Sequence, residues 1–239
     1  MRALTAEVVV AVTHSSLGDL EFLHLDGRNV EQLTDAMIEC TNLVSLSLSR
    51  NQLRAPLGPL VRCSALWHID LSFNRLESLE GLHHFVALGS LKLAYNRIPV
   101  HELRWIQDVE IIHLTLEGNP ATVDILEKVA RAGRSNGGDG CKGEGVVYAS
   151  YRPAALAVVP TPWTLDGQFV VAAERVAAFG LAAAVTAALD RSARSFAENM
   201  GGRRSVAQTA PFEWSSGAWD VGSSSWVGEL AVCHLNVLR

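Results

Sequence analysis

The sequence predicts an α/β solenoid: about five short repeats, with a curved parallel sheet on the concave side and helical or irregular segments on the convex side. Three observations lead to this prediction. An apolar pattern recurs every 22 or 23 residues in the first half of the chain, alternate apolar residues mark a short strand in each copy, and an asparagine follows each strand. Self-similarity at such a fixed period is the signature of a stacked-repeat protein.

The repeated pattern is L-x-x-L-x-L-x-x-N-x-L. Its clear copies are LVSLSLSRNQL at 43–53, LWHIDLSFNRL at 66–76, LGSLKLAYNRI at 88–98 and IIHLTLEGNP at 111–120. The asparagines are separated by 23, 22 and 23 residues: Asn51, Asn74, Asn96 and Asn119. A degenerate copy, LEFLHLDGRNV at 20–30, has Arg28 at the asparagine position. We interpret it as an atypical first repeat.

Each part of the pattern has a physical role. In the copy at 43–53, Leu46 and Leu48 point to one side of a strand while Ser45 and Ser47 point to the other. The leucines of successive copies then stack into a core. An asparagine after the strand can satisfy backbone groups of the turn, each of which would cost about 1–3 kcal/mol if buried without a partner. We therefore predict a structural ladder of asparagines.

At these spacings the chain resembles the leucine-rich repeat proteins whose repeats are about 22 residues long. Residues 151–175, YRPAALAVVPTPWTLDGQFVVAAER, are similar to the C-terminal cap that follows the last repeat in many intracellular members. The matching positions are Tyr151, Arg152, Ala155, Leu156, Val159, Pro160, Leu165, Asp166, Gly167, Val170, Glu174 and Arg175. Pro162 stands where leucine is usual. The resemblance implies that this segment covers the open apolar end of the array.

The predicted organisation has four parts. Leucine-rich repeats with an N-terminal cap occupy 1–127, a Gly-rich insertion 128–150, the C-terminal cap 151–177, and an Ala-rich helix with a Trp/Ser/Gly-rich tail 178–239. The insertion contains too little apolar surface to order itself, so we expect a mobile loop or a docking arm. It lacks the G-x-x-x-x-G-K-[ST] spacing of a phosphate-binding loop.

Two features of the last part bear on its environment. The uncharged run at 176–189 is shorter than the roughly 20 residues of a membrane span, so we expect a packed or partner-facing helix and no membrane. Trp214, Trp219 and Trp226 lie close together in the tail. They either fold back on the array or insert into a neighbouring protein, since tryptophan is frequent among interface anchors.

Charge and cysteine content exclude several classes. The chain has 20 basic and 25 acidic residues, so it lacks the basic excess of a nucleic-acid-binding protein. Cys40, Cys63, Cys141 and Cys233 form no C-x-x-C pair, which favours a reducing compartment. Cys40 and Cys63 occupy equivalent repeat positions, so we expect buried structural thiols. The first residues do not match a cleavable signal peptide, and we expect a cytosolic protein.

The residues that alternate with the core leucines should pave the concave face. They are Phe22, His24, Asp26, Ser45, Ser47, Ser49, His68, Asp70, Ser72, Ser90, Lys92, Ala94, His113, Thr115 and Glu117. Trp67, Phe73 and Tyr95 should lie at the margins. Five strands make a strip about 24 Å wide, which suits a peptide, a helix or part of a domain. The predicted partner-binding residues are Phe22, His24, Asp26, Ser47, Trp67, His68, Asp70, Phe73, Lys92, Tyr95, His113, Glu117, Trp214, Trp219 and Trp226.

Catalytic and metal-binding alternatives are weak. His24, His68 and His113 fall on alternate repeats, about 10 Å apart, which is too far for shared zinc ligands. Ser47 lies one strand from His24 and His68, but the sequence supplies no evident oxyanion hole or strained nucleophile turn. We expect no cofactor, no metal and no enzymatic activity.

The resemblance and the tail suggest a non-enzymatic scaffold of a large cytoskeletal assembly, such as a ciliary or flagellar axoneme, with partners that include tubulin-associated proteins. Two alternatives stay open: a soluble subunit that regulates an enzyme such as a protein phosphatase, and a spliceosomal-type adaptor. A nuclear location stays open with them. Fold alone does not decide among these functions.

Overall fold

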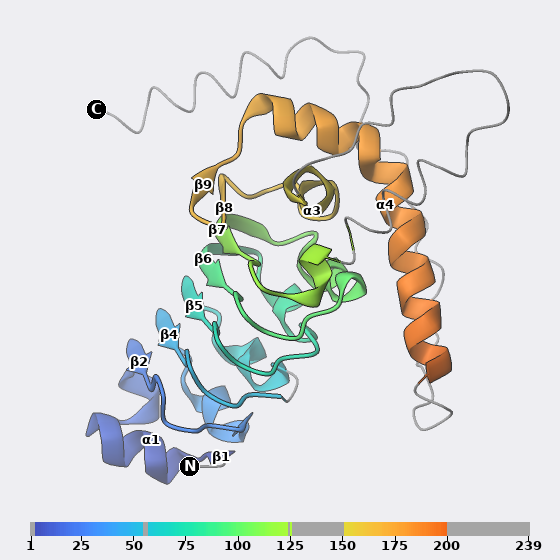
Figure 1. Cartoon of the computed structure of the whole chain (residues 1–239). Coiled ribbons are helices and arrows are strands. Elements are labelled where there is room, and N and C mark those ends of the chain that lie inside the picture. The colour runs from blue at the N-terminus through green and yellow to red at the C-terminus, as the bar shows by residue number, and fades with distance from the viewer. Residues whose placement is uncertain (1–2, 55–56, 124, 126–150, 200–239) are drawn as a thin grey trace, which may run out of the picture. The chain divides into compact units, whose positions relative to one another are not determined.

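The computed structural model describes residues 3–54, 57–123, 125 and 151–199. Five short strands, one from each predicted repeat, pair in parallel in chain order (Figure 1). They are β2 (Phe22–His24), β4 (Ser45–Ser47), β5 (His68–Asp70), β6 (Ala87–Lys92) and β7 (Glu110–Thr115). The predicted α/β solenoid is confirmed, with each repeat contributing one strand.

The register of the sheet aligns equivalent residues of successive repeats. Leu46 pairs with Leu23 on one side and Ile69 on the other, and the row continues through Leu91 and Leu114. All five side chains are buried. Because side chains alternate along a strand, this buried row sends the residues on either side of it to the opposite, concave face.

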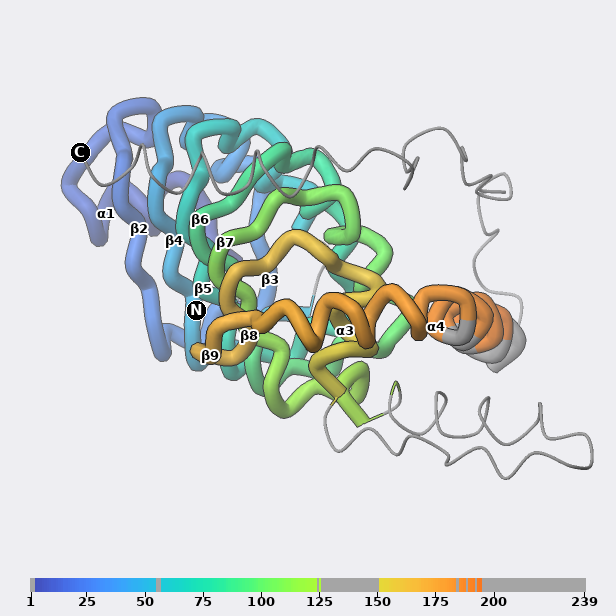
Figure 2. Tube along the Cα trace, turned by 90° about the horizontal axis from the view of Figure 1, so that it is seen from above, coloured from blue at the N-terminus to red at the C-terminus, as the bar shows by residue number. Residues whose placement is uncertain are grey.

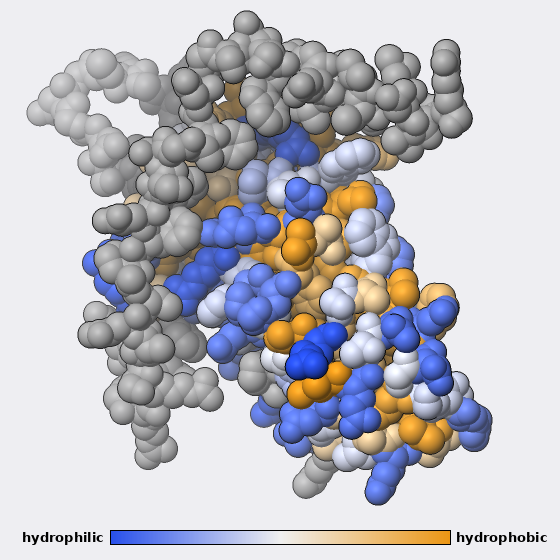
Figure 3. All heavy atoms as spheres, turned by 180° about the vertical axis from the view of Figure 1, so that it is seen from behind, coloured by the Kyte–Doolittle hydropathy of each residue, from blue (hydrophilic) through white to orange (hydrophobic). Residues whose placement is uncertain are grey.

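Short 3-10 helices form the convex side of the repeats. They are η1 (Leu17–Asp19), η2 (Asp35–Glu39), η3 (Gly58–Arg62), η4 (Leu82–His84) and η5 (Val100–Ile106). Cys40 and Cys63 directly follow η2 and η3 and are inaccessible to solvent, as the repeat spacing predicts. Viewed from behind, hydrophobic and hydrophilic residues are interspersed along the repeats (Figure 3).

The predicted asparagine ladder is confirmed. The Nδ2 group of Asn74 donates to the carbonyl of Leu71 in its own repeat at 3.0 Å and to that of Leu48 in the preceding repeat at 2.8 Å. Its Oδ1 accepts the amide of Leu53 at 3.0 Å. The same arrangement recurs at Asn51, Asn96 and Asn119. Each buried amide therefore ties one repeat to the one before it.

The N-terminal residues cover the first repeat. Strand β1 (Ala3–Leu4) pairs in parallel with β3 (Gln32–Leu33), and helix α1 (Ala6–Thr13) lies between them in sequence. Val9 of α1 is fully buried. This small second sheet gives the apolar core of the first repeat a neighbour on its open side.

The C-terminal segment extends the sheet. Helix α3 (Arg152–Val158) leads to the hairpin of β8 (Thr164–Leu165) and β9 (Gln168–Phe169), and helix α4 (Ala172–Asn199) follows. Strand β8 pairs in parallel with β7, and β9 pairs antiparallel with β8. The sheet therefore has seven strands. Figure 2 shows β8 and β9 continuing the stack of repeats.

Arginine side chains hold this C-terminal segment together. The Nε atom of Arg152 lies 2.6 Å from Oε1 of Glu174. Its guanidinium also donates to the carbonyls of Leu165 and of Phe169 in the hairpin. Arg175 donates to the carbonyl of Pro162 at 2.7 Å. Arg152 and Glu174 are among the residues that the sequence resemblance emphasises, and their contacts are structural.

Helix α4 packs on α3 and runs through residue 177, the predicted end of the cap. Ala178, Leu181 and Val185 are buried along one side of α4. Among the described helices, none alone has the length and hydropathy of a membrane span; Ala172–Ala183 and Val185–Arg191 pass that test only as a pair bent by 52°. The predicted insertion at 128–150, Cys141, Cys233 and the tail after residue 199 lie outside the described residues.

Candidate protein-binding surface

The predicted concave residues form aligned rows across the sheet. Phe22, Ser45, His68, Ser90, His113 and Thr164 pair successively in the first row. His24, Ser47, Asp70, Lys92 and Thr115 pair in the second row. Thr164 comes from the cap, and its Oγ1 lies 2.8 Å from Nδ1 of His113. The concave face therefore continues from the repeats onto the C-terminal hairpin.

Hydrogen bonds fix the polar residues of the first two repeats. The hydroxyl of Ser47 donates to Oδ1 of Asp26 at 2.6 Å, and the amide of Ser49 donates to the same oxygen at 2.8 Å. Burial alone would raise the pKa of Asp26, but these hydrogen bonds together outweigh it and lower that pKa. Nε2 of His24 lies 3.2 Å from Oγ of Ser45. The hydroxyl of Ser47 is therefore bonded to a carboxylate, and the imidazole of His24 lies beside Ser45 instead.

The centre of the face carries an ion pair. Nζ of Lys92 lies 3.5 Å from Oδ2 of Asp70, and Oδ1 of Asp70 accepts the amide of Ser72 at 3.0 Å. The Lys92 side chain is 53% exposed. These contacts hold Asp70 in place while the ammonium group stays in reach of a partner.

Two carboxylates lie together at the C-terminal end of the face. Oδ1 of Asp166 accepts the amides of Leu116 at 2.7 Å and Glu117 at 3.0 Å. Burial raises the pKa of Asp166, the two amides act against this, and the negative charge of Glu117 adds to the rise. The end of the face at β7 and β8 is therefore acidic.

An aromatic stack borders the face at the carboxyl ends of the strands. The rings of Phe73 and Tyr95 have centroids 4.7 Å apart and planes inclined by 10°. The guanidinium of Arg50 lies 5.5 Å from the centroid of the Phe73 ring. The hydroxyl of Tyr95 donates to Oε1 of Glu117 at 3.0 Å, a bond that raises the pKa of Tyr95. Phe73 and Tyr95 are each 46% exposed.

The stacked residues share an unusual backbone conformation. Arg50, Phe73 and Tyr95 have φ angles of 55°, 56° and 55°, and the equivalent positions in the flanking repeats are Gly27 at 66° and Gly118 at 73°. Glycine adopts this left-handed region readily, whereas other residues do so at a cost of about 1–2 kcal/mol. The three central repeats therefore carry large side chains where the turn itself favours glycine.

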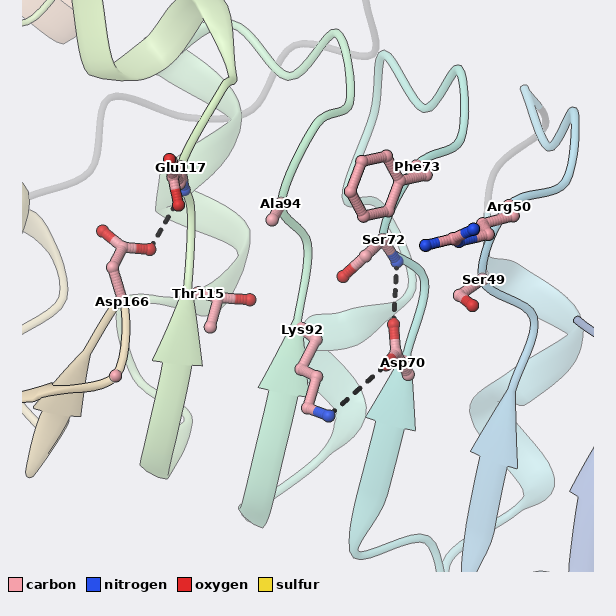
Figure 4. Close-up of a pocket in the computed structure, with 11 residues that line it drawn as sticks. Ser49, Arg50, Asp70, Ser72, Phe73, Lys92, Ala94, Thr115, Glu117 and Asp166 are labelled. Atoms are coloured by element: carbon pink, nitrogen blue, oxygen red, sulfur yellow. Dashed lines mark hydrogen bonds and ion pairs between the residues drawn. The ribbon is translucent and has the colours of Figure 1, made fainter.

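A hollow of about 480 Å³ lies between this stack and the second row (Figure 4). It spans the turns after β4 to β8 and is lined by Ser49, Arg50, Asp70, Ser72, Phe73, Lys92, Ala94, Thr115, Glu117, Asp166 and Gly167. Its lining combines small side chains with aromatic and charged ones. The hollow is open to solvent, as a site for a protruding side chain of a partner requires.

The opposite margin, at the amino ends of the strands, carries tryptophans. Trp67 is 41% exposed, and its indole covers Gly89 so closely that a Cβ atom there would lie 2.0 Å from Nε1. Trp163, which precedes β8, is 56% exposed. Large exposed apolar side chains on both margins of a polar strip are typical of the aromatic anchors found at protein interfaces.

The structure brings together most of the predicted partner-binding residues. Those on the concave face and its margins are Phe22, His24, Asp26, Ser47, Trp67, His68, Asp70, Phe73, Lys92, Tyr95, His113 and Glu117. Phe22 is 60% exposed at the N-terminal edge. Trp214, Trp219 and Trp226 lie outside the described residues. Within the described ranges, no group of three or more His, Cys, Asp or Glu residues is arranged to hold a metal ion.

Four residues of this surface are not among the predicted partner-binding residues: Arg50, Trp163, Thr164 and Asp166. Arg50 has a detectable signal, because it occupies the same repeat position as Phe73 and Tyr95. Asp166 is noted as a cap residue, but its place on the face depends on the β8–β9 hairpin. The dipeptide Asp166-Gly167 is a hairpin-turn signal that predicts this pairing.

Comparisons with known proteins bear on the fold. No family model matches the chain, and no curated protein sequence matches it significantly. Among solved structures, it is similar to a chain of the Drosophila melanogaster SNF/U2A' complex, with 22% identity and a TM-score of 0.53 over 76% of this chain and 92% of that one. The fold is that of a leucine-rich repeat array. An internalin, InlF of Listeria monocytogenes, matches with 23% identity and a TM-score of 0.39, covering 60% of this chain and 39% of the internalin chain.

Proposed function

We propose that this protein is a non-enzymatic scaffold that binds a protein partner on the concave face of its leucine-rich repeat array. The proposal rests on one observation: exposed aromatic side chains border the polar strip on both sides. Trp67 and Trp163 lie on one margin, and Phe73 and Tyr95 lie on the other. Interface cores are rich in aromatic anchors, while the polar rows supply hydrogen bonds and charge complementarity.

The geometry favours binding over catalysis. The hydroxyl of Ser47 is bonded to Asp26, and the hollow is open to solvent, with Lys92 and Asp70 of its lining joined in an ion pair. A nucleophile needs a neighbouring base and a site that excludes water. On the described part of this face, Ser45 has an imidazole beside it and Ser47 a carboxylate, but both pairs are exposed to solvent.

For the assembly, we propose a large cytoskeletal structure such as the ciliary or flagellar axoneme, with tubulin-associated proteins among the partners. This rests on the resemblance of residues 151–175 to the cap of ciliary members. A spliceosomal-type adaptor is the second candidate, because the structural likeness extends over 92% of a chain from the SNF/U2A' complex. A soluble subunit that regulates a phosphatase is the third candidate, and it would use the same face.

Affinity capture tests the role of the concave face. Tagged full-length protein is compared with Ser90→Trp, which places a bulky ring in the middle of the first row on β6. Ser64→Trp, on an exposed turn of the convex side, is the matched control. We expect Ser90→Trp to lose the partners that quantitative mass spectrometry finds with the wild type, and Ser64→Trp to keep them. Retention by Ser90→Trp at unchanged melting temperature contradicts the proposal.

Sequential extraction distinguishes the assemblies. A salt-resistant cytoskeletal pellet that also contains tubulin-associated proteins supports the axonemal scaffold. Release by mild detergent, together with one splicing factor or one enzyme, supports the adaptor or the regulatory subunit. Deleting 201–239 should free an axonemal scaffold from the pellet if the tail anchors it, while a soluble complex held by the concave face should survive the deletion.

A further inference from the structure

The hollow on the concave face has an uneven distribution of charge. Its lining contains two basic residues, Arg50 and Lys92, and three acidic ones, Asp70, Glu117 and Asp166. Lys92 pairs with Asp70, and Arg50 lies at the opposite end of the hollow from Asp166 (Figure 4). In the described part of the chain, no basic side chain lies within ion-pair distance of Glu117 or Asp166. The end at β7 and β8 therefore carries uncompensated negative charge.

The two carboxylates leave room for a cation. Asp166 uses Oδ1 to accept two backbone amides, and Glu117 uses Oε1 to accept the Tyr95 hydroxyl. Among the described residues, no hydrogen bond reaches Oδ2 of Asp166 or Oε2 of Glu117. A positive group between these oxygens would replace repulsion between like charges with attraction.

The remainder of the hollow suits an aliphatic chain. Part of its lining consists of small side chains, those of Ser49, Ser72 and Ala94. The wall is the edge of Phe73, because Arg50 covers one face of this ring and Tyr95 the other. Tyr95 in turn rests against Gly118, where a Cβ atom would lie 2.5 Å from Cδ1 of the ring. A partner thus meets ring edges and small groups, with carboxylates beyond them.

We propose that this hollow receives an arginine side chain of the partner protein, with the aliphatic stem along Ala94 and the edge of Phe73 and the guanidinium between Glu117 and Asp166. The inference rests on the proposed function, because it names the partner chemistry of the same face. Arginine fits because its planar guanidinium can bridge two carboxylates and is weakly hydrated, and its stem packs on apolar surface. The partner segment is therefore basic where it crosses β7 and β8.

The test titrates full-length, isotope-labelled protein with N-acetyl-arginine N-methylamide and follows backbone amide signals by NMR. The matched ligand is the citrulline analogue, which has nearly the same shape but no charge. We expect saturable shifts at Leu116 and Glu117, whose amides contact Asp166, and at Tyr95. Citrulline should bind about fivefold more weakly, the size expected for a partly exposed ion pair. Equal binding of both ligands, or no saturable shift at these amides, overturns the proposal.

A pair of variants on one strand checks the position. Glu117→Gln should weaken arginine binding toward the level of citrulline, because one of the two carboxylates loses its charge. Glu110→Gln removes an exposed carboxylate of β7 outside the hollow and should leave arginine binding unchanged. Equal effects of the two variants would mean a nonspecific charge effect and overturn the assignment. Calcium chloride is titrated separately. If calcium saturates the shifts of the same amides at a lower concentration than arginine does, the arginine assignment is also overturned.

The captured partner separates this inference from the proposed function. If Ser90→Trp abolishes partner binding but Glu117→Gln leaves it unchanged, the concave face binds the partner and the arginine site is wrong. If Ser90→Trp has no effect, the proposed function fails, whatever the arginine titration gives. Loss of partner binding in both variants, with Glu110→Gln unaffected, supports both.

Discussion

Asn74 donates a hydrogen bond to the carbonyl of Leu48, one repeat earlier in the chain, at 2.8 Å. The same side chain bonds its own repeat at Leu71 and accepts the amide of Leu53. One buried amide thus satisfies several backbone groups that the tight turns leave without partners. The regular spacing of such side chains aligns the strands, and the aligned strands in turn align the rows of the concave face.

Replacing Asn74 with alanine should lower the free energy of unfolding by roughly 3 kcal/mol, because several buried backbone groups lose their partners at once. Urea denaturation followed by circular dichroism measures the change. Asn42→Ala is the matched control: its exposed side chain makes one bond, to the carbonyl of Gly18, and the loss should be about 0.5 kcal/mol. Similar losses in the two variants would contradict the ladder's structural role.

The repeats could be predicted from sequence because the same local pattern of apolar residues recurs five times in the chain. Leu46 and its equivalents fix the strand, the buried side and the register together. The hairpin of β8 and β9 belongs to no repeat: the Asp166-Gly167 turn indicates that the two strands pair, but their place in the sheet depends on contact with β7. For the same reason Asp166 could not be placed on the candidate site from the sequence, although Glu117 beside it and the aromatic residues at the centre of the site could.

The stability of the C-terminal segment should depend on pH through Glu174. The hydrogen bond from Arg152 is the main reason why the pKa of Glu174 lies below its ordinary value of 4.5. A carboxylate with a lowered pKa in the folded state stabilises the protein above its unfolded pKa, and this stabilisation is lost as the pH falls through the folded pKa. At pH 7, Glu174→Gln should cost about 2 kcal/mol, and the difference from the wild type should shrink as the pH falls below about 4.5.

Urea denaturation between pH 7 and pH 3 measures this difference. Glu77→Gln is the control, since its contact with Arg97 is 3.8 Å long and both side chains are mostly exposed. It should change the free energy of unfolding by about 0.5 kcal/mol or less at any pH. A constant difference between wild type and Glu174→Gln across this range would show that the carboxylate's charge is not what stabilises the segment.

The buried cysteines should be unreactive in the folded protein. Burial raises the pKa of Cys63 to about 12 and also raises that of Cys40, and both thiols are inaccessible to solvent. Since the thiolate is the reactive form, a disulfide reagent at pH 8 should label neither within an hour, and should label both after unfolding in urea. The assay uses a Cys141→Ser, Cys233→Ser background, so that only these two thiols report. Rapid labelling of the native protein would contradict the predicted burial.

The stack of Phe73 and Tyr95 should contribute more to partner binding than to the stability of the fold. At Phe73, glycine would relieve the left-handed backbone at φ 56°, worth about 1 kcal/mol, while the lost stacking on Tyr95 costs about the same. Phe73→Gly should therefore change the free energy of unfolding by less than about 0.5 kcal/mol, yet weaken arginine binding in the hollow because the aromatic wall is gone. The partner's affinity should fall with it.

The reverse change at the equivalent turn position is the matched test. Gly118→Ala forces a Cβ atom to within 2.5 Å of the Tyr95 ring at a φ of 73°, so it should destabilise the protein by about 1–2 kcal/mol. A loss above about 2 kcal/mol in Phe73→Gly would instead make the stack part of the framework that holds the repeats together. In that case the stack would serve the stability of the turns. Only Trp67, Trp163 and the charged rows would then support partner binding on the concave face.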